Sequence, residues 1–144
     1  MDENDIRKYI LKTFQSVDVI EDLGNFFFIF DPKNKIPFVT IVTNNKYDNY
    51  SDLDRRGVFR LNIGIGKETY RSMFPVDKIP TESGYDFSAL NKVMPHPEYG
   101  RVYWVCVLNP SESTFNDLLP MLDEAYQRAI RKYKTAQFAE GLSR

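Results

Sequence analysis

The sequence predicts an α+β fold, in which N-terminal and C-terminal helices pack on one face of an antiparallel sheet of four or five strands. Both ends of the chain carry apolar residues at helical spacing. The middle holds runs of β-branched and aromatic residues joined by hairpin-length links. The length of 144 residues, with 42% hydrophobic and 27% charged, is typical of one packed domain. We expect a single domain over residues 1–144, with its core at about 3–135 and a loose tail at 136–144.

The first predicted element is an amphipathic helix over residues 3–15. Its apolar side chains recur at the spacing of one helix face: Ile6, Tyr9, Ile10 and Phe14. Asp2 or Asn4 can cap the N-terminus, and acidic residues in the first turn suit the positive end of the helix dipole.

Strand-like segments follow. They lie at residues 17–20, 25–30, 38–42, 58–65 and 102–108. The turn residues between the second and third segments predict a hairpin. Alternation in the fourth segment indicates a half-buried strand that turns Arg60 and Asn62 away from the core. The fifth segment is apolar on both faces, which indicates a central, covered strand.

The remaining segments are loops and helices. We expect a polar loop at 44–57, a short helix at 67–74, and a long ordered loop at 75–101 with one helical turn near 87–93.

The last segment is the clearest helix. Its apolar residues follow a 3.6-residue period: Leu118, Leu122, Ala125, Tyr126, Ala129, Ile130 and Tyr133. Thr114 or Asn116 can cap this helix. A cap at Asn116 would place Pro120 in the first turn, where its missing N–H has no intrahelical acceptor.

Charge and composition argue against several classes of protein. The net charge of −1 lacks the basic excess of nucleic-acid-binding proteins, although a local basic face is compatible with it. The single cysteine, Cys106, excludes an internal disulfide, and with the single histidine, His96, it cannot complete a structural zinc site. We therefore expect neither metal nor cofactor. An acidic N-terminus and the lack of an apolar run of about 20 residues predict a cytoplasmic protein that does not associate with membranes.

Polar residues on one strand face and on nearby loops suggest a ligand site. Arg60 and Asn62 project side by side, and a guanidinium beside an amide suits a carboxylate or phosphate. The alternative is a surface arginine paired with Asp52 or Asp54. The other candidates for binding a ligand lie elsewhere along the chain: Lys67, His96, Tyr47, Tyr50 and Tyr99.

His96 is the candidate for catalysis. Prolines on both sides stiffen its backbone, and Glu98 or Asp86 could orient its ring as a general base. A lone histidine in such a loop is more often structural. Cys106 is a poor nucleophile candidate, because a thiol in the middle of a strand is expected to be buried and protonated.

Two further patterns have both a functional and a structural interpretation. Residues 64–69 join a strand to a helix and resemble a phosphate-binding loop, but their glycine spacing and Glu68 favour a simple turn. Basic residues crowd the end of the last helix, where they could bind nucleic acid or complement the helix dipole. These residues are Arg128, Arg131, Lys132 and Lys134, and the first three are the candidates for contacting nucleic acid.

Several motifs together resemble an uncharacterised bacterial family of domains of unknown function. The resemblance spans about residues 3–133. It rests on FRLNIG at 59–64, MPHPEY at 94–99 and WVCVLNPSE at 104–112, with the segments 38–43 and 50–55. The resemblance implies no activity.

More remotely, the order of elements is similar to that of the MmcQ/YjbR group of small α+β proteins. The likeness rests on residues 97–99 leading to residues 103–105, and on a closing helix over 118–126. It implies a helix, an antiparallel sheet and a closing helix, together with the DNA-binding role suggested for that group from its fold.

The leading functional prediction is a binding module for a small anionic or polar ligand. Nucleic-acid binding of the MmcQ/YjbR type is the first alternative. A small enzyme with His96 as general base is the second, so enzymatic activity is left open.

Overall fold

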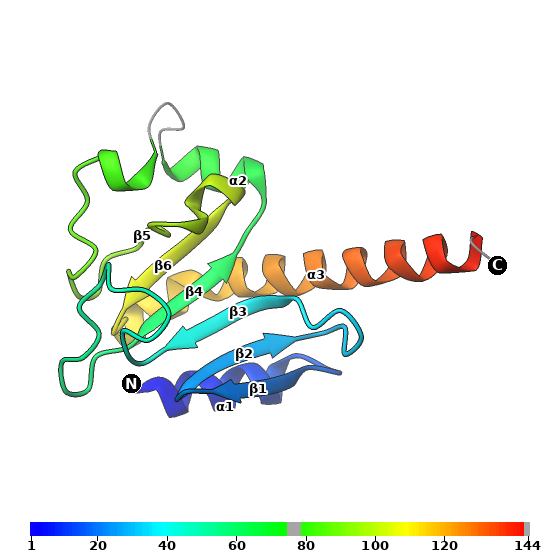
Figure 1. Ribbon diagram of the computed structural model, residues 1–144, viewed down its shortest axis with the longest axis horizontal. Helices are drawn as coiled ribbons and strands as arrows, with labels where there is room; N and C mark the ends of the chain where they lie inside the picture. The colour runs from blue at the N-terminus through cyan, green and yellow to red at the C-terminus, as the bar shows by residue number, and fades with distance from the viewer. Residues whose placement is uncertain (75–78, 143–144) are drawn as a thin grey trace.

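The computed structural model describes residues 1–74 and 79–142. The chain forms α1 (Glu3–Thr13), β1 (Asp18–Asp22), β2 (Asn25–Ile29), β3 (Pro37–Val42), β4 (Arg60–Gly64), α2 (Lys67–Met73), β5 (Met94–Pro95), β6 (Trp104–Leu108) and α3 (Glu112–Leu142), with 3₁₀ turns at Pro80–Glu82 and Tyr99–Val102. The strands make one sheet in the order β1-β2-β3-β4-β6-β5, and neighbouring strands are antiparallel (Figure 1). The predicted α+β class, the hairpin of β2 with β3, and both terminal helices are confirmed.

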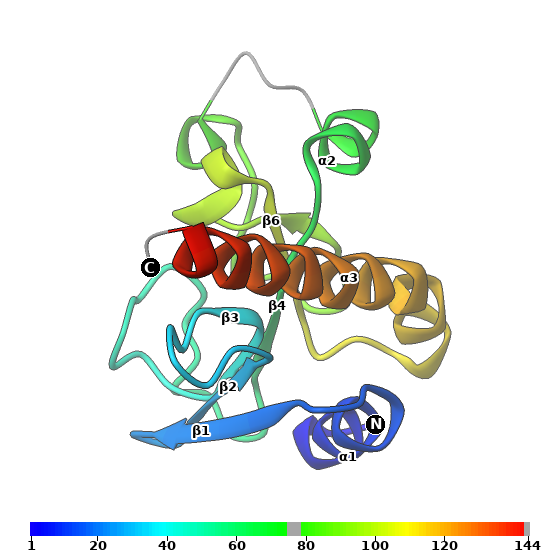
Figure 2. The ribbon, with the colours of Figure 1, turned by 90° about the vertical axis from the view of Figure 1, so that its right-hand side faces the viewer.

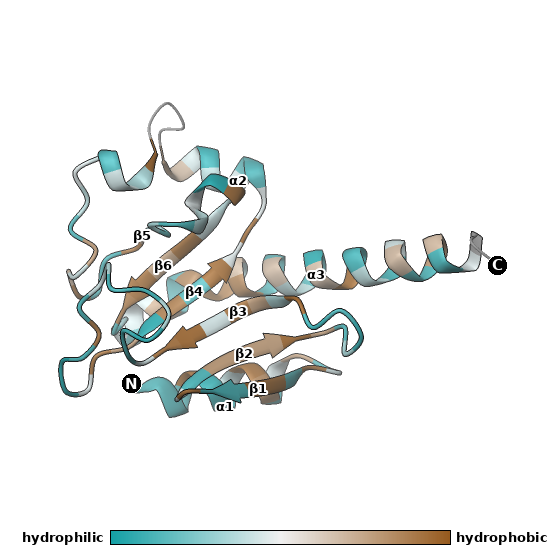
Figure 3. Ribbon diagram, viewed as in Figure 1, coloured by the Kyte–Doolittle hydropathy of each residue, from teal (hydrophilic) through white to brown (hydrophobic). Residues whose placement is uncertain are grey.

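α1 and α3 cover the same face of the sheet, as predicted (Figures 1 and 2). The main core lies between these helices and the alternate strand residues that face them. It includes Ile6 and Ile10 of α1, Leu118 and Leu122 of α3, and Val39, Ile41, Leu61, Ile63, Val105 and Val107 of the strands. The hydropathy of the chain follows this arrangement, because the strands of the middle of the sheet are the most apolar elements (Figure 3). At the N-terminus of α1, Asp2 and Asp5 form a capping box.

The described residues form a sheet of six strands, so the prediction of four or five was too low. The additional strand is β5, whose two residues pair with β6 inside the proline-rich segment expected to be a loop. Two residues are too few to give a periodic signal. The helical turn expected near 87–93 was also wrong, since this stretch contains turns and a bridge from Leu90 to Leu108 instead. Residues 75–78 of the predicted loop lie outside the described part of the chain.

α3 begins earlier than the sequence suggested. It starts at Glu112, and the hydroxyl of Ser111 accepts a hydrogen bond from the Thr114 N–H (3.1 Å), so neither predicted cap is correct. Pro120 therefore lies inside the helix and not in its first turn. Residues 136–142 of the expected tail continue the helix, whereas 143–144 are not described. No helix in the described ranges is long and apolar enough to cross a membrane.

The opposite face of the sheet is covered by loops, so β4 is buried on both faces and the prediction of a half-buried strand was wrong. A smaller apolar cluster lies here: Val42, Leu53, Phe87, Met94, Cys106 and Leu108. Leu53 and Phe87 come from the two long loops. The strand register aligns Thr40, Asn62 and Cys106 across this face. Periodicity cannot distinguish a loop-covered face from a solvated one, because both accept polar side chains.

Candidate functional site

Arg60 is the centre of a buried polar cluster on the loop-covered face. Its guanidinium is 1% exposed and forms a bidentate ion pair with Asp48, at 3.0 Å (Nη1 to Oδ1) and 2.7 Å (Nη2 to Oδ2). Nη1 also donates to the hydroxyl of Ser51 (2.9 Å) and Nε donates to Asn62 Oδ1 (2.9 Å). The partner is therefore not Asp52 or Asp54, which the sequence offered.

Asp48 keeps its negative charge in this cluster. Burial alone would raise its pKa, but the hydrogen bonds and the positive charge of Arg60 hold the pKa below its usual value. A bidentate pair inside a protein keeps both charges compensated. The guanidinium fork, which suited either an anionic ligand or an acidic residue of the chain, is thus filled by a carboxylate of the chain itself.

His96 is a neutral ring whose proton is on Nε2. Its Nδ1 accepts hydrogen bonds from the backbone N–H groups of Glu98 (3.1 Å) and Tyr99 (3.0 Å), and an accepting ring nitrogen carries no proton. Burial, reinforced by the charge of Arg60, lowers the pKa of His96 to about 3. Nε2 lies 3.5 Å from Arg60 Nη2, but both atoms carry hydrogens, so this contact is not a hydrogen bond. Within the described chain the Nε2–H group has no acceptor.

Asn62 and Thr40 add two further donors to the same face. Arg60 Nε can only donate, so it fixes the Asn62 amide with Oδ1 toward itself and Nδ2 toward Thr40 Oγ1 (2.9 Å). The second hydrogen of Nδ2 and the hydroxyl hydrogen of Thr40 then remain for another acceptor. Together with the Nε2–H of His96, they make three uncharged donors on one sheet face.

A pocket of about 420 Å³ is lined by all three donors. Its aromatic lining comes from Phe27, Tyr47, Tyr99 and Trp104. The Tyr99 ring lies beside that of His96, with centroids 4.9 Å apart. The carboxylates of Asp48 and Glu98 also line the pocket. Since Asp48 is neutralised by Arg60, the pocket is not cationic.

The structure brings together some of the sequence-predicted residues and separates others. Asn62, His96 and Tyr99 line this pocket and Arg60 lies directly behind it. Lys67 and Tyr50 do not line it. Lys67 is an exposed residue at the start of α2, and Tyr50 is 43% exposed on the covering loop.

Sequence reasoning missed Asp48, Thr40 and Trp104. Thr40 carried a usable signal, because a polar residue at an alternate position of an otherwise apolar strand is a candidate for the second sheet face. Asp48 had no comparable signal, since it lies in a polar loop among several acidic residues. Trp104 packs against Gly64, where an added Cβ would lie 2.8 Å from the indole, so only glycine admits the ring there.

Local contacts show which group orients the His96 ring and where the Cys106 thiol lies. Glu98 orients His96 through its backbone N–H, and Asp86 bonds to Ser88 instead. Cys106 is buried, as expected, and burial raises the pKa of its thiol to about 12, which favours the protonated form. No group of three potential metal-binding side chains occurs among the described residues.

The glycine turn before α2 is occupied by the protein itself. The Gly66 N–H donates to Glu124 Oε2 (2.6 Å), and the Thr69 hydroxyl donates to Glu124 Oε1 (2.6 Å). This carboxylate from α3 takes the position that a phosphate would need at the helix N-terminus. The interpretation of residues 64–69 as a structural turn therefore agrees with the structure.

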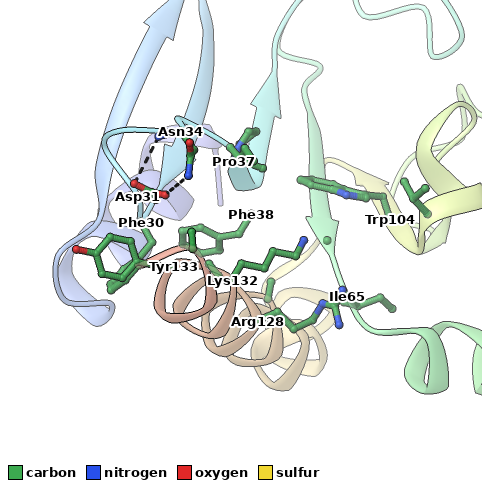
Figure 4. A pocket seen from close by; sticks show the side chains of 16 residues that line it. Phe30, Asp31, Asn34, Pro37, Phe38, Ile65, Trp104, Arg128, Lys132 and Tyr133 are labelled. Atoms are coloured by element: carbon green, nitrogen blue, oxygen red, sulfur yellow. Dashed lines mark hydrogen bonds between the residues drawn. The ribbon is translucent and has the colours of Figure 1, made fainter. Parts of the chain in front are cut away.

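The three basic candidates lie along one stretch of α3. Arg128 and Lys132 line a second pocket, which also contains Trp104 (Figure 4). Arg131 does not line this pocket, although it borders a shallower hollow together with Arg128 and Lys132.

Comparison with known proteins places the chain in a protein family. The model of a family of unknown function, DUF6194, matches residues 1–138. Searches of the curated proteins and of the solved structures give no significant match. The family match confirms the sequence-based identification of a domain of unknown function, and the likeness to the MmcQ/YjbR group stays a prediction.

Proposed function

Because the chain belongs to DUF6194, a family of unknown function, we propose a function from its site alone: the binding of a small, uncharged, flat ligand through a carbonyl or amide oxygen. The oxygen would accept hydrogen bonds from Thr40, Asn62 and His96. The flat body would pack among the aromatic side chains of the pocket.

One observation carries the proposal: Thr40, Asn62 and His96 each keep a donor hydrogen that no group of the described chain accepts at the pocket. Their hydrogen-bond roles follow from neighbours that can only donate, namely Arg60 Nε and two backbone N–H groups. A buried site built from donors favours a ligand with a matching acceptor, because an unpaired buried donor costs about 1–3 kcal/mol. The lining of mostly apolar walls with a few placed polar groups is typical of small-molecule sites.

The charge of the pocket favours an uncharged ligand over an anion. Arg60 has its charge compensated by Asp48, and Glu98 adds a negative charge to the lining. The sequence predicted either an anionic or a polar ligand, and the charge of the pocket favours the polar one. A general-base role for His96 gains no support, because a ring with a pKa of about 3 is a weak base and its Nδ1 is already bonded.

A ligand screen with a matched pair of variants tests the proposal. The probes are flat neutral amides (benzamide, nicotinamide and uracil), and benzoate serves as the charged analogue of benzamide. We expect the amides to raise the melting temperature and to change the fluorescence of Trp104, the only tryptophan. The substitution Thr40→Val removes the hydroxyl donor at nearly constant volume, together with the oxygen that holds the Asn62 amide in place.

The control is Thr43→Val, which removes a hydroxyl that bonds to the Gly24 carbonyl away from the pocket. We expect Thr40→Val to abolish the amide response, whereas Thr43→Val retains it. A benzoate response that is as strong as the benzamide response and is lost in Thr40→Val, or equal losses of the amide response in both variants, would count against the donor site.

Nucleic-acid binding is kept as the alternative proposal, together with the MmcQ/YjbR-like architecture on which it rests. The observation in its favour is the clustering of Arg128, Arg131 and Lys132 on one stretch of α3. It predicts affinity for a short DNA duplex that falls steeply with salt concentration and decreases when any of the three is neutralised.

A further inference from the structure

A second pocket, of about 300 Å³, lies between the turn that joins β2 to β3 and the middle of α3 (Figure 4). Its lining is largely apolar and aromatic, with Phe30, Phe38, Trp104 and Tyr133 among its residues. It shares Trp104 with the pocket of the proposed function, but none of the three donors lines it.

Two cations enter this pocket from α3. Arg128 and Lys132 are four residues apart, so they project from the same side of the helix. Figure 4 shows both side chains extending toward the side of the pocket formed by Ile65 and Trp104. Lys132 remains exposed at the rim, yet partial burial and the charge of Arg128 lower its pKa. The two positive charges therefore disfavour each other at the pocket.

Two carboxylates lie near these cations, Asp31 in the lining and Glu124 one turn before Arg128, but within the described residues neither is paired with them. Asp31, the carboxylate that lines the pocket, already accepts from the Lys33 N–H (3.0 Å) and from Asn34 Nδ2 (2.6 Å). Glu124, one turn before Arg128, is bound to the start of α2 through both oxygens.

We propose that this pocket binds a small organic anion. Its carboxylate or phosphate group would lie between Arg128 and Lys132, and its apolar body would pack against Trp104 and Tyr133. A guanidinium and an ammonium on one side of an apolar hollow suit an oxyanion, because each supplies charge-assisted hydrogen bonds. This site is independent of the proposed function, since it uses a different set of polar residues.

Titration calorimetry on the full chain, with Trp104 fluorescence as a second readout, tests the site. The probes are benzoate and phenyl phosphate, with benzamide as the neutral comparison and inorganic phosphate as the anion without an apolar body. We expect saturable binding of the two aromatic anions and weaker binding of inorganic phosphate. Benzamide is expected to bind in the other pocket, so the measurement that counts here is whether its binding depends on Arg128 and Lys132.

Four variants assign the binding. Arg128→Gln and Lys132→Gln remove the cations of the pocket, while Arg131→Gln and Lys134→Gln remove equal charges from positions outside it. We expect Arg128→Gln and Lys132→Gln each to weaken the binding of phenyl phosphate at least tenfold. Arg131→Gln and Lys134→Gln should each change it less than twofold. Binding of benzamide should not change in any of the four variants.

Two results would overturn the proposal. One is the absence of saturable binding by either aromatic anion. The other is an equal loss in all four variants, accompanied by salt-sensitive binding of a DNA duplex, which would assign these residues to a nucleic-acid surface.

Discussion

The neutral, buried His96 makes the stability of the fold depend on pH between 5 and 7. The pKa of this ring falls from an ordinary value of 6.5 to about 3 on folding. Below pH 6.5 the unfolded chain therefore binds a proton that the folded chain excludes, so the free energy of unfolding rises with pH across this window. The contribution of His96 to the free energy of unfolding is fully present well above pH 6.5, and it is lost progressively as the pH falls toward 3.

The linkage relation gives the size of the effect. Lowering the pH from 7 to 5 is expected to reduce the free energy of unfolding by about 2 kcal/mol. For 144 residues this corresponds to a fall of roughly 6 °C in the melting temperature. Other groups contribute little here, because His96 is the only histidine and the pKa of its neighbour Asp48 lies below the ordinary value of 3.8. Cys106 stays protonated throughout.

Urea unfolding followed by Trp104 fluorescence at pH 5, 6 and 7 measures this dependence. The control is His96→Asn, whose Oδ1 can accept the same backbone N–H groups but does not titrate. We expect the variant to lose most of the pH dependence of the wild-type protein. An equal loss of stability in both proteins between pH 7 and 5 would refute the reasoning, as would an NMR titration of His96 with a midpoint near 6.5.

Two further substitutions test the buried ion pair and the start of α3. Asp48→Asn should lower the free energy of unfolding by about 3–5 kcal/mol, because it leaves the 1%-exposed Arg60 without its counter-charge. The matched change Asp52→Asn, at an exposed pair, should alter it by less than about 1 kcal/mol in the same chemical unfolding experiment. Pro120→Ala should raise the melting temperature, because it restores an N–H inside α3 at an exposed position and gains about 1–3 kcal/mol. No gain would instead support a helix that starts near Asn116.

The sequence alone predicted the elements that have a local, periodic signal. The apolar stripes of α1 and α3 and the turn between β2 and β3 are encoded within a few residues of one another, so their structures could be inferred without the fold. The burial of Cys106 followed in the same way, from an apolar run too continuous for an exposed strand. The motifs around Arg60 and His96 also led to the correct family.

The tertiary structure decided what surrounds those residues. Arg60 could have paired with any of several acidic residues in the loop before it. The path of that loop, which no repeat or period encodes, selects Asp48. The role of His96 depends on two backbone N–H groups, because they place its proton on Nε2.

The two pockets also depend on the tertiary structure. Each is lined by segments that are distant in the chain, and Trp104 lines both. A side chain's preference for one face of a helix or strand is a local property and can be read from spacing. Its partners, its protonation and the cavity beside it depend on which segments fold against that face, and these are fixed only when the whole chain packs.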